Sequence, residues 1–129
     1  MRRITLAVLF TLSAGVATAA PHSDEAELAK ALAGRTATKT ADCVDPSQLG
    51  GPQAIGKQTI IYRQSGRRIW RNTLPEVCRW LDPNVTFIIE QYGSRICRDD
   101  RFRIVEHGSR IPSPYCRFGS FTAYDKPKR

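Results

Sequence analysis

The sequence predicts a mainly β protein: a small antiparallel sheet curled into a half-open barrel or sandwich, linked by disulfides and preceded by a short N-terminal helix. Three observations lead to this fold class. Five or six short runs rich in β-branched and aromatic residues are separated by turn residues at hairpin spacing. No long amphipathic helix is present to build a βαβ unit. The four cysteines are even in number and have no metal-binding spacing, which favours disulfides in an exported chain.

Residues 1–19 have the pattern of a secretory signal peptide. Arg2 and Arg3 form a basic head, and a mostly apolar run follows over residues 4–16, shorter than the about 20 residues that a membrane-spanning helix needs. Small residues at Ala17 and Ala19 suit a signal peptidase, so we expect cleavage after Ala19. The alternative is a buried N-terminal helix. No cysteine follows the run, so we expect a mature soluble protein without a lipid anchor, periplasmic or extracellular.

The mature chain is expected to be basic, with most of the charge in its second part. The full sequence has a net charge of +8, which falls to +6 when Arg2 and Arg3 leave with the signal peptide. Residues 43–129 carry fifteen basic and eight acidic side chains, and arginine outnumbers lysine twelve to three. Arginine suits planar anions and aromatic faces, which indicates an anionic ligand. The alternative is a charge excess that only sets solubility and nonspecific adhesion.

Residues 20–42 are expected to form a short helix and a tether. Ser23 is a suitable N-cap, acidic residues follow it, and Gly34 is a natural stop, which together predict a helix over 24–33. Leu28 and Leu32 share one face of that helix and could dock on the domain. The alanine- and threonine-rich residues after Gly34 predict a flexible tether that ends at residue 42.

A disulfide-containing β-domain is predicted over residues 43–129. Leu49 and Ile55 are expected to enter its core. Two β-branched and aromatic runs on either side of Ser65-Gly66 predict a hairpin between about residues 58 and 74.

Each strand of this hairpin places an arginine beside an aromatic residue, Arg63 by Tyr62 and Arg71 by Trp70. Such pairs could form a stacking platform for a sugar or a base. The alternative is cross-strand packing, with the arginine stem lying over a ring.

The remaining strands follow from alternation and turn residues. One helical turn is expected between Pro75 and Leu81. The run 85–92 is the most apolar and is predicted to be a central strand. Short strands are expected at 95–98 and 101–107, joined by an Asp99-Asp100 turn, with Phe102 and Ile104 on one face of the second. A closing strand is predicted over 116–121.

Two disulfides are expected among Cys43, Cys78, Cys97 and Cys116, for which three connectivities exist. The hairpin brings its end near Leu74 beside its start, which favours Cys43–Cys78 together with Cys97–Cys116. Cys43–Cys116 with Cys78–Cys97 is the second choice. A catalytic thiol is the functional alternative for one of these cysteines.

The chain resembles a family of small exported proteobacterial proteins, of the kind found in sphingomonads, that have a domain of unknown function. The resemblance lies in the segments "LAKALAGR", "DCVD", "RNTLPEVC", "ICRDD" and "CRFGSFTAY" and covers nearly the whole mature chain. In that family a proline usually follows the second cysteine, where this chain has Arg79. The resemblance implies a periplasmic or secreted β-domain and assigns no catalytic residue.

Enzymatic motifs are weak. His22 lies in the predicted N-terminal tether, so His107 is the single plausible catalytic imidazole. Glu90 could meet it across strands, near Arg71 or Arg103, as in a small ribonuclease. The Asp99-Asp100 pair lacks the glycine and distal glutamate of a calcium loop, and no phosphate-binding glycine motif is present. We therefore expect no metal, no cofactor and no enzyme.

Three function classes follow from the sequence. The first is a non-enzymatic structural or interaction module of the cell envelope, with no assigned partner. The second is a binder of anionic polymers, whether lipopolysaccharide, nucleic acid or acidic glycan, that uses the Trp70 hairpin and a face formed by Arg95, Arg98, Arg101 and Arg103. The third is a small basic hydrolase that uses His107.

Overall fold

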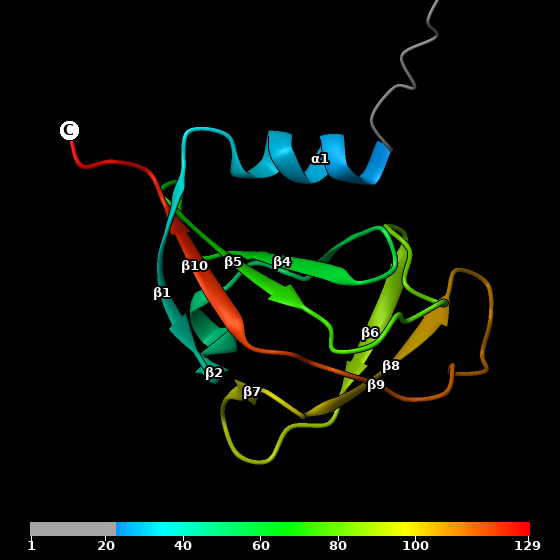
Figure 1. The fold of residues 1–129 in the computed structure, drawn as a ribbon. Helices are drawn as coiled ribbons and strands as arrows, with labels where there is room; N and C mark the ends of the chain where they lie inside the picture. The colour runs from blue at the N-terminus through cyan, green and yellow to red at the C-terminus, as the bar shows by residue number, and fades with distance from the viewer. Residues whose placement is uncertain (1–22) are drawn as a thin grey trace, which may run out of the picture.

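A five-stranded antiparallel sheet forms the central layer of this computed structural model, which describes residues 23–129 (Figure 1). The predicted signal peptide and the expected start of the mature chain lie outside the described residues. The strands occur in the order β1-β10-β5-β4-β3. Their bounds are Thr36–Ala41 (β1), Phe121–Asp125 (β10), Arg68–Thr73 (β5), Thr59–Arg63 (β4) and Gln53–Ile55 (β3).

Two smaller antiparallel sheets complete the β structure, and the three sheets remain separate rather than closing into a barrel. One pairs β2 with β7, and the other has the order β6-β8-β9. Their bounds are Cys43–Val44 (β2), Ile96–Cys97 (β7), Val85–Ile89 (β6), Arg101–Glu106 (β8) and Cys116–Arg117 (β9), and a 3-10 turn, η1, spans Pro46–Gln48. The predicted mainly β, disulfide-linked class is confirmed.

The central sheet buries both of its faces, as the apolar run of β4 suggests. Ile60 and Tyr62 point into the main core, where Phe102, Phe118 and Phe121 form a chain of ring contacts. The alternate residues of the sheet point to the opposite face. Because successive side chains of a strand alternate between faces, an uninterrupted apolar run indicates a strand that is covered on both sides.

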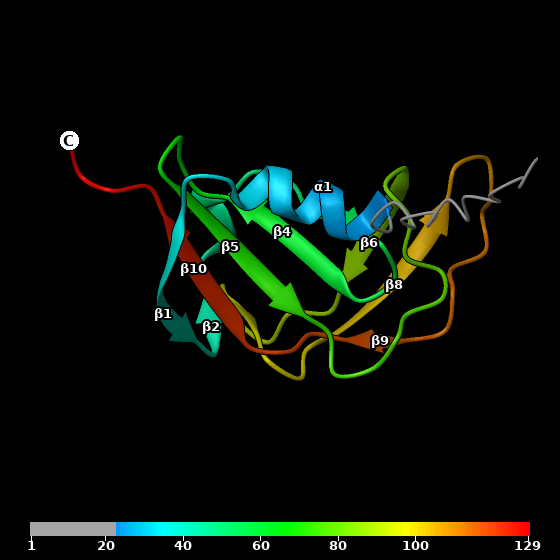
Figure 2. The same ribbon diagram turned by 45° about the horizontal axis from the view of Figure 1, so that its top comes forward.

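The short helix α1 (Ser23–Leu32) covers that opposite face of the sheet (Figure 2). Leu28, Ala31 and Leu32 pack against a small cluster of Ile55, Ile61 and Ile69. The helix begins and ends one residue before the predicted bounds, and the leucine pair docks on the domain as proposed. Ile55 is buried and Leu49 is half-buried, which confirms both as core contacts.

The segment after α1 is not a tether: residues 36–41 form β1, an edge strand that pairs with β10. Thr36 lies opposite Asp125, and Ala41 lies opposite Phe121. The side chains of β1 are almost all exposed, so the strand lacks the apolar alternation that marks half-buried strands. This segment is a strand because its backbone pairs with β10, and no pattern in its own residues predicts that strand.

Three further local predictions need correction. The apolar strand β6 lies at the edge of its sheet and not at the centre, because only β8 pairs with it. Residues 75–81 form bends and a turn without a helix. The predicted closing strand over 116–121 is divided: its start is β9 in the small sheet, and its end begins β10 in the central sheet.

Asn72 holds the chain at the point where it passes from β9 to β10. Its side chain is fully buried. Its amide nitrogen donates to the Gly119 carbonyl oxygen at 2.7 Å, and its amide oxygen accepts from the Gly119 N–H at 2.8 Å. A Cβ at Gly119 would overlap the Thr73 carbonyl oxygen. The "RNTL" and "CRFG" segments on which the resemblance rests are therefore in direct contact.

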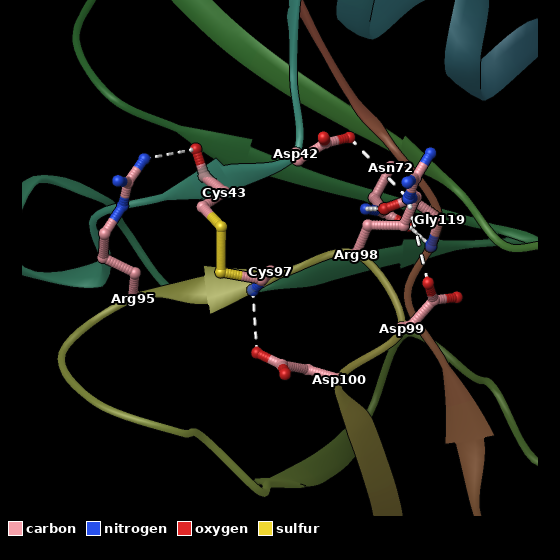
Figure 3. The surroundings of a disulfide bond; sticks show 9 residues. All are labelled: Asp42, Cys43, Asn72, Arg95, Cys97, Arg98, Asp99, Asp100 and Gly119. Atoms are coloured by element: carbon pink, nitrogen blue, oxygen red, sulfur yellow. Dashed lines mark hydrogen bonds and ion pairs between the residues drawn. A yellow bond between two sulfur atoms is a disulfide. The ribbon is translucent and has the colours of Figure 1, made fainter.

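The disulfides are Cys43–Cys97 and Cys78–Cys116, so both the favoured and the second-choice pairings are wrong. Figure 3 shows the first of these bonds. Cys43 lies directly opposite Cys97 in the β2–β7 pair. The hairpin does bring Cys78 near its start, since the Cys78 N–H donates to the Lys57 carbonyl. Cys43, however, leaves that region to pair with β7. No free cysteine is present in residues 23–129, which removes the catalytic thiol alternative there.

Candidate anion-binding site

Two adjoining hollows open at the end of the central sheet where β1 starts, the β4–β5 hairpin turns and the chain leaves β10. Their volumes are about 630 Å³ and about 250 Å³, and they share Gln48, Gln64 and Arg68. We name the pair the basic hollow. Its cationic side chains are Lys39, Arg67, Arg68, Arg95, Lys126 and Lys128, and its carboxylates are Asp45 and Asp125.

Pairing between distant segments brings these cations together. The C-terminal tail is held against the hairpin turn, because the Lys126 N–H donates to the Arg67 carbonyl at 3.0 Å and the Arg67 guanidinium donates to the Lys126 carbonyl at 3.3 Å. Arg95 reaches the hollow from the loop before β7, where its guanidinium donates to the Cys43 carbonyl at 3.2 Å. Lys39 comes from the edge strand β1.

Both carboxylates of the hollow already have partners on this chain. Asp125 accepts two hydrogen bonds of 2.7 Å from Arg68 and one of 2.8 Å from the Thr38 hydroxyl. The bond from Arg68 is the main cause that lowers the pKa of Asp125 to about 2. Asp45 caps η1 and accepts hydrogen bonds from the Ser47 hydroxyl and N–H, which lower its pKa.

The other cations of the hollow lack such partners. Among residues 23–129, ion pairs involve only arginines, and Arg68 is the one arginine of the hollow that has one. Five cations of the hollow therefore have no carboxylate of residues 23–129 within ion-pair distance, namely Lys39, Arg67, Arg95, Lys126 and Lys128. At longer range, Arg95 and Lys39 still help to lower the pKa values of Asp45 and Asp125. Like charges held close together repel one another, and an anionic ligand would relieve this repulsion.

Trp70 lies at the base of the smaller hollow and is only 6% exposed. Its ring N–H donates to Gln64 at 2.7 Å, and the Gln64 amide nitrogen donates to Gln48 at 3.0 Å. Lys39 Nζ and Arg68 Cζ lie 5.5 and 5.6 Å from the centre of the ring. Trp70 therefore supports the polar lining and offers no surface for stacking.

The predicted stacking platform on the hairpin is wrong for the same reason. Tyr62 is buried beside Trp70, its cross-strand partner. Arg63 and Arg71 follow these rings directly in the strands and therefore point to the other face of the sheet. The packing alternative holds, although the cations near the Trp70 ring are Lys39 and Arg68 instead of Arg71.

The four predicted anion-binding arginines separate into three places. Arg95 lies at the basic hollow. Arg98, on the other side of the disulfide, has its Nε at 3.7 Å from Asp42 and 3.8 Å from Asp99 (Figure 3). Arg101 and Arg103 lie on the outer face of β8, over Tyr115.

The contacts of these two β8 arginines form a closed network. Their guanidinium carbons lie 4.6 and 4.9 Å from the centre of the Tyr115 ring. Arg101 also pairs with Glu90 at 3.0 Å, and the Tyr115 hydroxyl donates to Glu90 at 2.6 Å. The Arg103 Nε donates to the Ser113 carbonyl at 2.8 Å. The network holds the loop before β9 against the sheet. These internal contacts give the two arginines of β8 a structural role that needs no ligand.

The hydrolase constellation is not assembled. Glu90 lies beside Arg101 at the start of β8, whereas His107 follows the end of that strand. Six residues of extended chain separate the two positions by about 20 Å. His107 instead lines a small hollow with Trp80, Asp82 and Glu106. The chain turns at Asp99-Asp100 as predicted, since Asp99 has a φ of 68° and Asp100 accepts from the Cys97 N–H at 2.8 Å. The expected hairpin is wrong, because β7 pairs with β2 whereas β8 pairs with β6 and β9.

Residues 23–129 contain neither a metal-binding cluster nor a membrane-spanning helix. No cluster of three or more histidine, cysteine or carboxylate side chains is arranged to hold a metal ion. No helix in the same part of the chain is long and apolar enough to cross a bilayer.

The sequence interpretation missed most of the basic hollow. Lys126, Lys128 and Arg67 were not among the predicted anion-binding residues. The local signal was present, as "GRR" in the hairpin and "DKPKR" at the C-terminus, but about 60 residues separate these segments. Only the pairing of β10 with β5 brings them together.

Comparisons with protein-family models, with curated proteins and with solved structures gave no match for the chain. The resemblance to the family of exported proteobacterial proteins therefore stays a prediction, and the candidate site depends on the geometry of the basic hollow.

Proposed function

We propose that this protein is an exported, non-enzymatic binding module of the cell envelope that captures an anionic polymer through the basic hollow. The observation that carries the proposal is the set of five cations around the hollow with no carboxylate bound to them. A linear polyanion could contact several of them at once, and each contact would release a condensed counterion.

The proposal of export has separate support. Two disulfides cross-link the domain, and such bonds persist in oxidising compartments such as the periplasm. The signal-peptide pattern of residues 1–19 agrees with this compartment.

The hollow is a better candidate than the outer face of β8. Arg101 has a carboxylate and an aromatic ring as partners, Arg103 has the same ring and a carbonyl, and Arg98 lies between two carboxylates. A ligand at Arg98 or Arg101 would have to compete with a carboxylate that is already paired with the arginine. In the hollow, the guanidinium groups of Arg67 and Arg95 donate only to backbone carbonyls, and no carboxylate among residues 23–129 lies within ion-pair distance of them.

Binding of a polyphosphate chain tests the proposal, because this polymer has neither sugar nor base. The variant Arg67→Gln, Lys126→Gln, Lys128→Gln removes three charges from the hollow. The variant Arg101→Gln, Arg103→Gln, Arg117→Gln removes three charges elsewhere and has the same net charge. At about 1 kcal/mol for each cation near an anionic surface, the loss of three cations costs about 3 kcal/mol, so the hollow variant should lose about 100-fold in affinity.

The affinity of the control variant for polyphosphate should stay within about threefold of that of the parent protein. The small loss would come from its lower net charge. Equal losses in the two variants would mean that net charge alone attracts the polymer. Failure of the parent protein to bind polyphosphate in about 50 mM salt would refute the proposed function itself.

A further inference from the structure

We infer that the polymer recognised by the basic hollow is a phosphorylated oligosaccharide and not a nucleic acid. This inference rests on the proposed function and adds the chemical class of the ligand. It comes from the neutral polar groups that lie between the cations and from the lack of an exposed aromatic ring among them.

The orientation of two amides in the hollow follows from Trp70. An indole nitrogen can only donate, so the Gln64 oxygen must face Trp70 and the Gln64 nitrogen must face Gln48. That nitrogen donates to the Gln48 oxygen, which leaves the Gln48 amide nitrogen with two hydrogens to donate. No acceptor within residues 23–129 takes them, and Gln48 lines both halves of the hollow.

Two hydroxyl groups extend this row of neutral donors. The Ser65 oxygen accepts from the Arg67 and Arg68 N–H groups at 3.2 and 3.3 Å, so its own hydrogen remains able to donate. Thr36 lines the larger hollow from the exposed edge strand β1. An amide and two hydroxyls between positive charges match a ligand that alternates hydroxyl groups with anions, as a phosphorylated sugar does.

The type of cation is compatible with phosphate. Three of the five unpaired cations are lysines, whose compact ammonium groups bind phosphate oxygens without requiring a planar partner. The arginine fork at the junction of the two hollows, Arg68, is already matched in two-point fashion to Asp125. A hollow of about 630 Å³ also lies within the range of about 300–1,000 Å³ typical of pockets for small ligands, which suits one or a few sugar units.

A single-stranded nucleic acid would find no platform for its bases. Proteins that bind such strands stack the bases on exposed aromatic rings. Within residues 23–129, the single aromatic ring that lines the basic hollow is Trp70, which is buried beneath cations. The strongly exposed tyrosines of the described chain, Tyr92 and Tyr115, lie elsewhere: Tyr115 packs on β8 and Tyr92 follows β6.

Four small probes separate these ligand classes in an NMR titration of the oxidised protein. They are glucose 1,6-bisphosphate, thymidine 3′,5′-bisphosphate, inorganic phosphate and glucose. The two bisphosphates carry the same number of phosphates and differ in presenting sugar hydroxyls or a base. We expect glucose 1,6-bisphosphate to bind at least about fivefold more tightly than each of the other three, the gain expected from one or two added hydrogen bonds.

Variants of the neutral donors test the same point without changing charge. Thr36→Val and Gln48→Met should each weaken glucose 1,6-bisphosphate binding about three- to tenfold and leave polyphosphate binding within twofold. Thr86→Val, at an exposed position of β6, is the matched control and should change neither.

Each other outcome has a separate meaning. Tighter binding of thymidine 3′,5′-bisphosphate would overturn the inference in favour of nucleic acid and leave the proposed function intact. Equal affinities for the two bisphosphates would overturn it too, because the hollow would then recognise phosphate alone. The same conclusion would follow if Thr36→Val and Gln48→Met left the affinity for glucose 1,6-bisphosphate unchanged. If polyphosphate also failed to bind, the proposed function and the inference would both be refuted.

Discussion

Replacing Asn72 with alanine tests the contact that joins the two most distinctive sequence segments. The substitution removes both hydrogen bonds to Gly119 and leaves the N–H and the carbonyl of that buried residue without a side-chain partner. A buried backbone group without a partner costs about 1–3 kcal/mol. We therefore expect the free energy of unfolding to fall by about 2–6 kcal/mol, out of the about 5–15 kcal/mol typical of a domain.

Urea denaturation of the oxidised protein, followed by tryptophan fluorescence, measures this loss. Asn84→Ala is the matched control, since Asn84 is exposed and contributes only a backbone N–H to the hydrogen bond with Asp82. It should change the stability by less than about 0.5 kcal/mol. A loss below about 1 kcal/mol for Asn72→Ala would show that water or a shifted backbone satisfies Gly119, and the reasoning would fail.

Gly119→Ala provides an independent check on the same contact. The added Cβ would overlap the Thr73 carbonyl oxygen, so the chain must shift and the Asn72 bonds must lengthen or break. If so, combining the two substitutions should cost less than the sum of the single losses, because both remove one shared contact. Additive losses would show that Gly119 matters for packing alone.

Three further predictions concern charge, burial and cross-links. The pKa of Asp125 is lowered to about 2, below its usual value of about 3.9, so its stabilising effect is complete above pH 4 and is lost as the pH falls from about 4 to about 2. The urea midpoint of Asp125→Asn should therefore change less with pH across that range than the midpoint of the parent protein. An equal pH dependence in both proteins would contradict the pairing with Arg68. The Tyr62 hydroxyl is buried without a partner among the described residues, and burial raises its pKa. Tyr62→Phe should therefore increase the free energy of unfolding by about 1 kcal/mol, which a higher melting temperature would show. A lower melting temperature would mean that the hydroxyl has a hydrogen-bond partner after all. The disulfides close loops of 54 and 38 residues, and each should stabilise the fold by about 4 kcal/mol through loop entropy. Because Cys78 is also fully buried, replacing Cys78 and Cys116 should lower the stability measured by calorimetry more than replacing Cys43 and Cys97. The reverse order would refute the packing argument.

Local patterns were sufficient for several elements of this protein. The residues that predict helix α1, namely Ser23 at its start, the Leu28 and Leu32 pair and Gly34 at its stop, lie within twelve residues. The hairpin of β4 and β5 has its turn residues between two runs that pair with each other. The inward faces of Phe102 and Ile104 follow from alternation within β8. Each of these features depends on residues close together in the chain, so the sequence by itself determined them.

Pairings between distant segments were decided only by the tertiary structure. The edge strand β1 carries no apolar pattern and is ordered by β10, about 85 residues later. The disulfide pairing depends on β2 meeting β7 across 54 residues. The arginines of residues 95–103 looked like one charged face and are divided by their partners, whereas the basic hollow collects cations from β1, the hairpin, the loop before β7 and the C-terminal tail. Side-chain alternation fixes which face a residue occupies within its own strand, but the neighbour of each strand depends on how the whole core packs, and that choice placed both the cysteines and the cations.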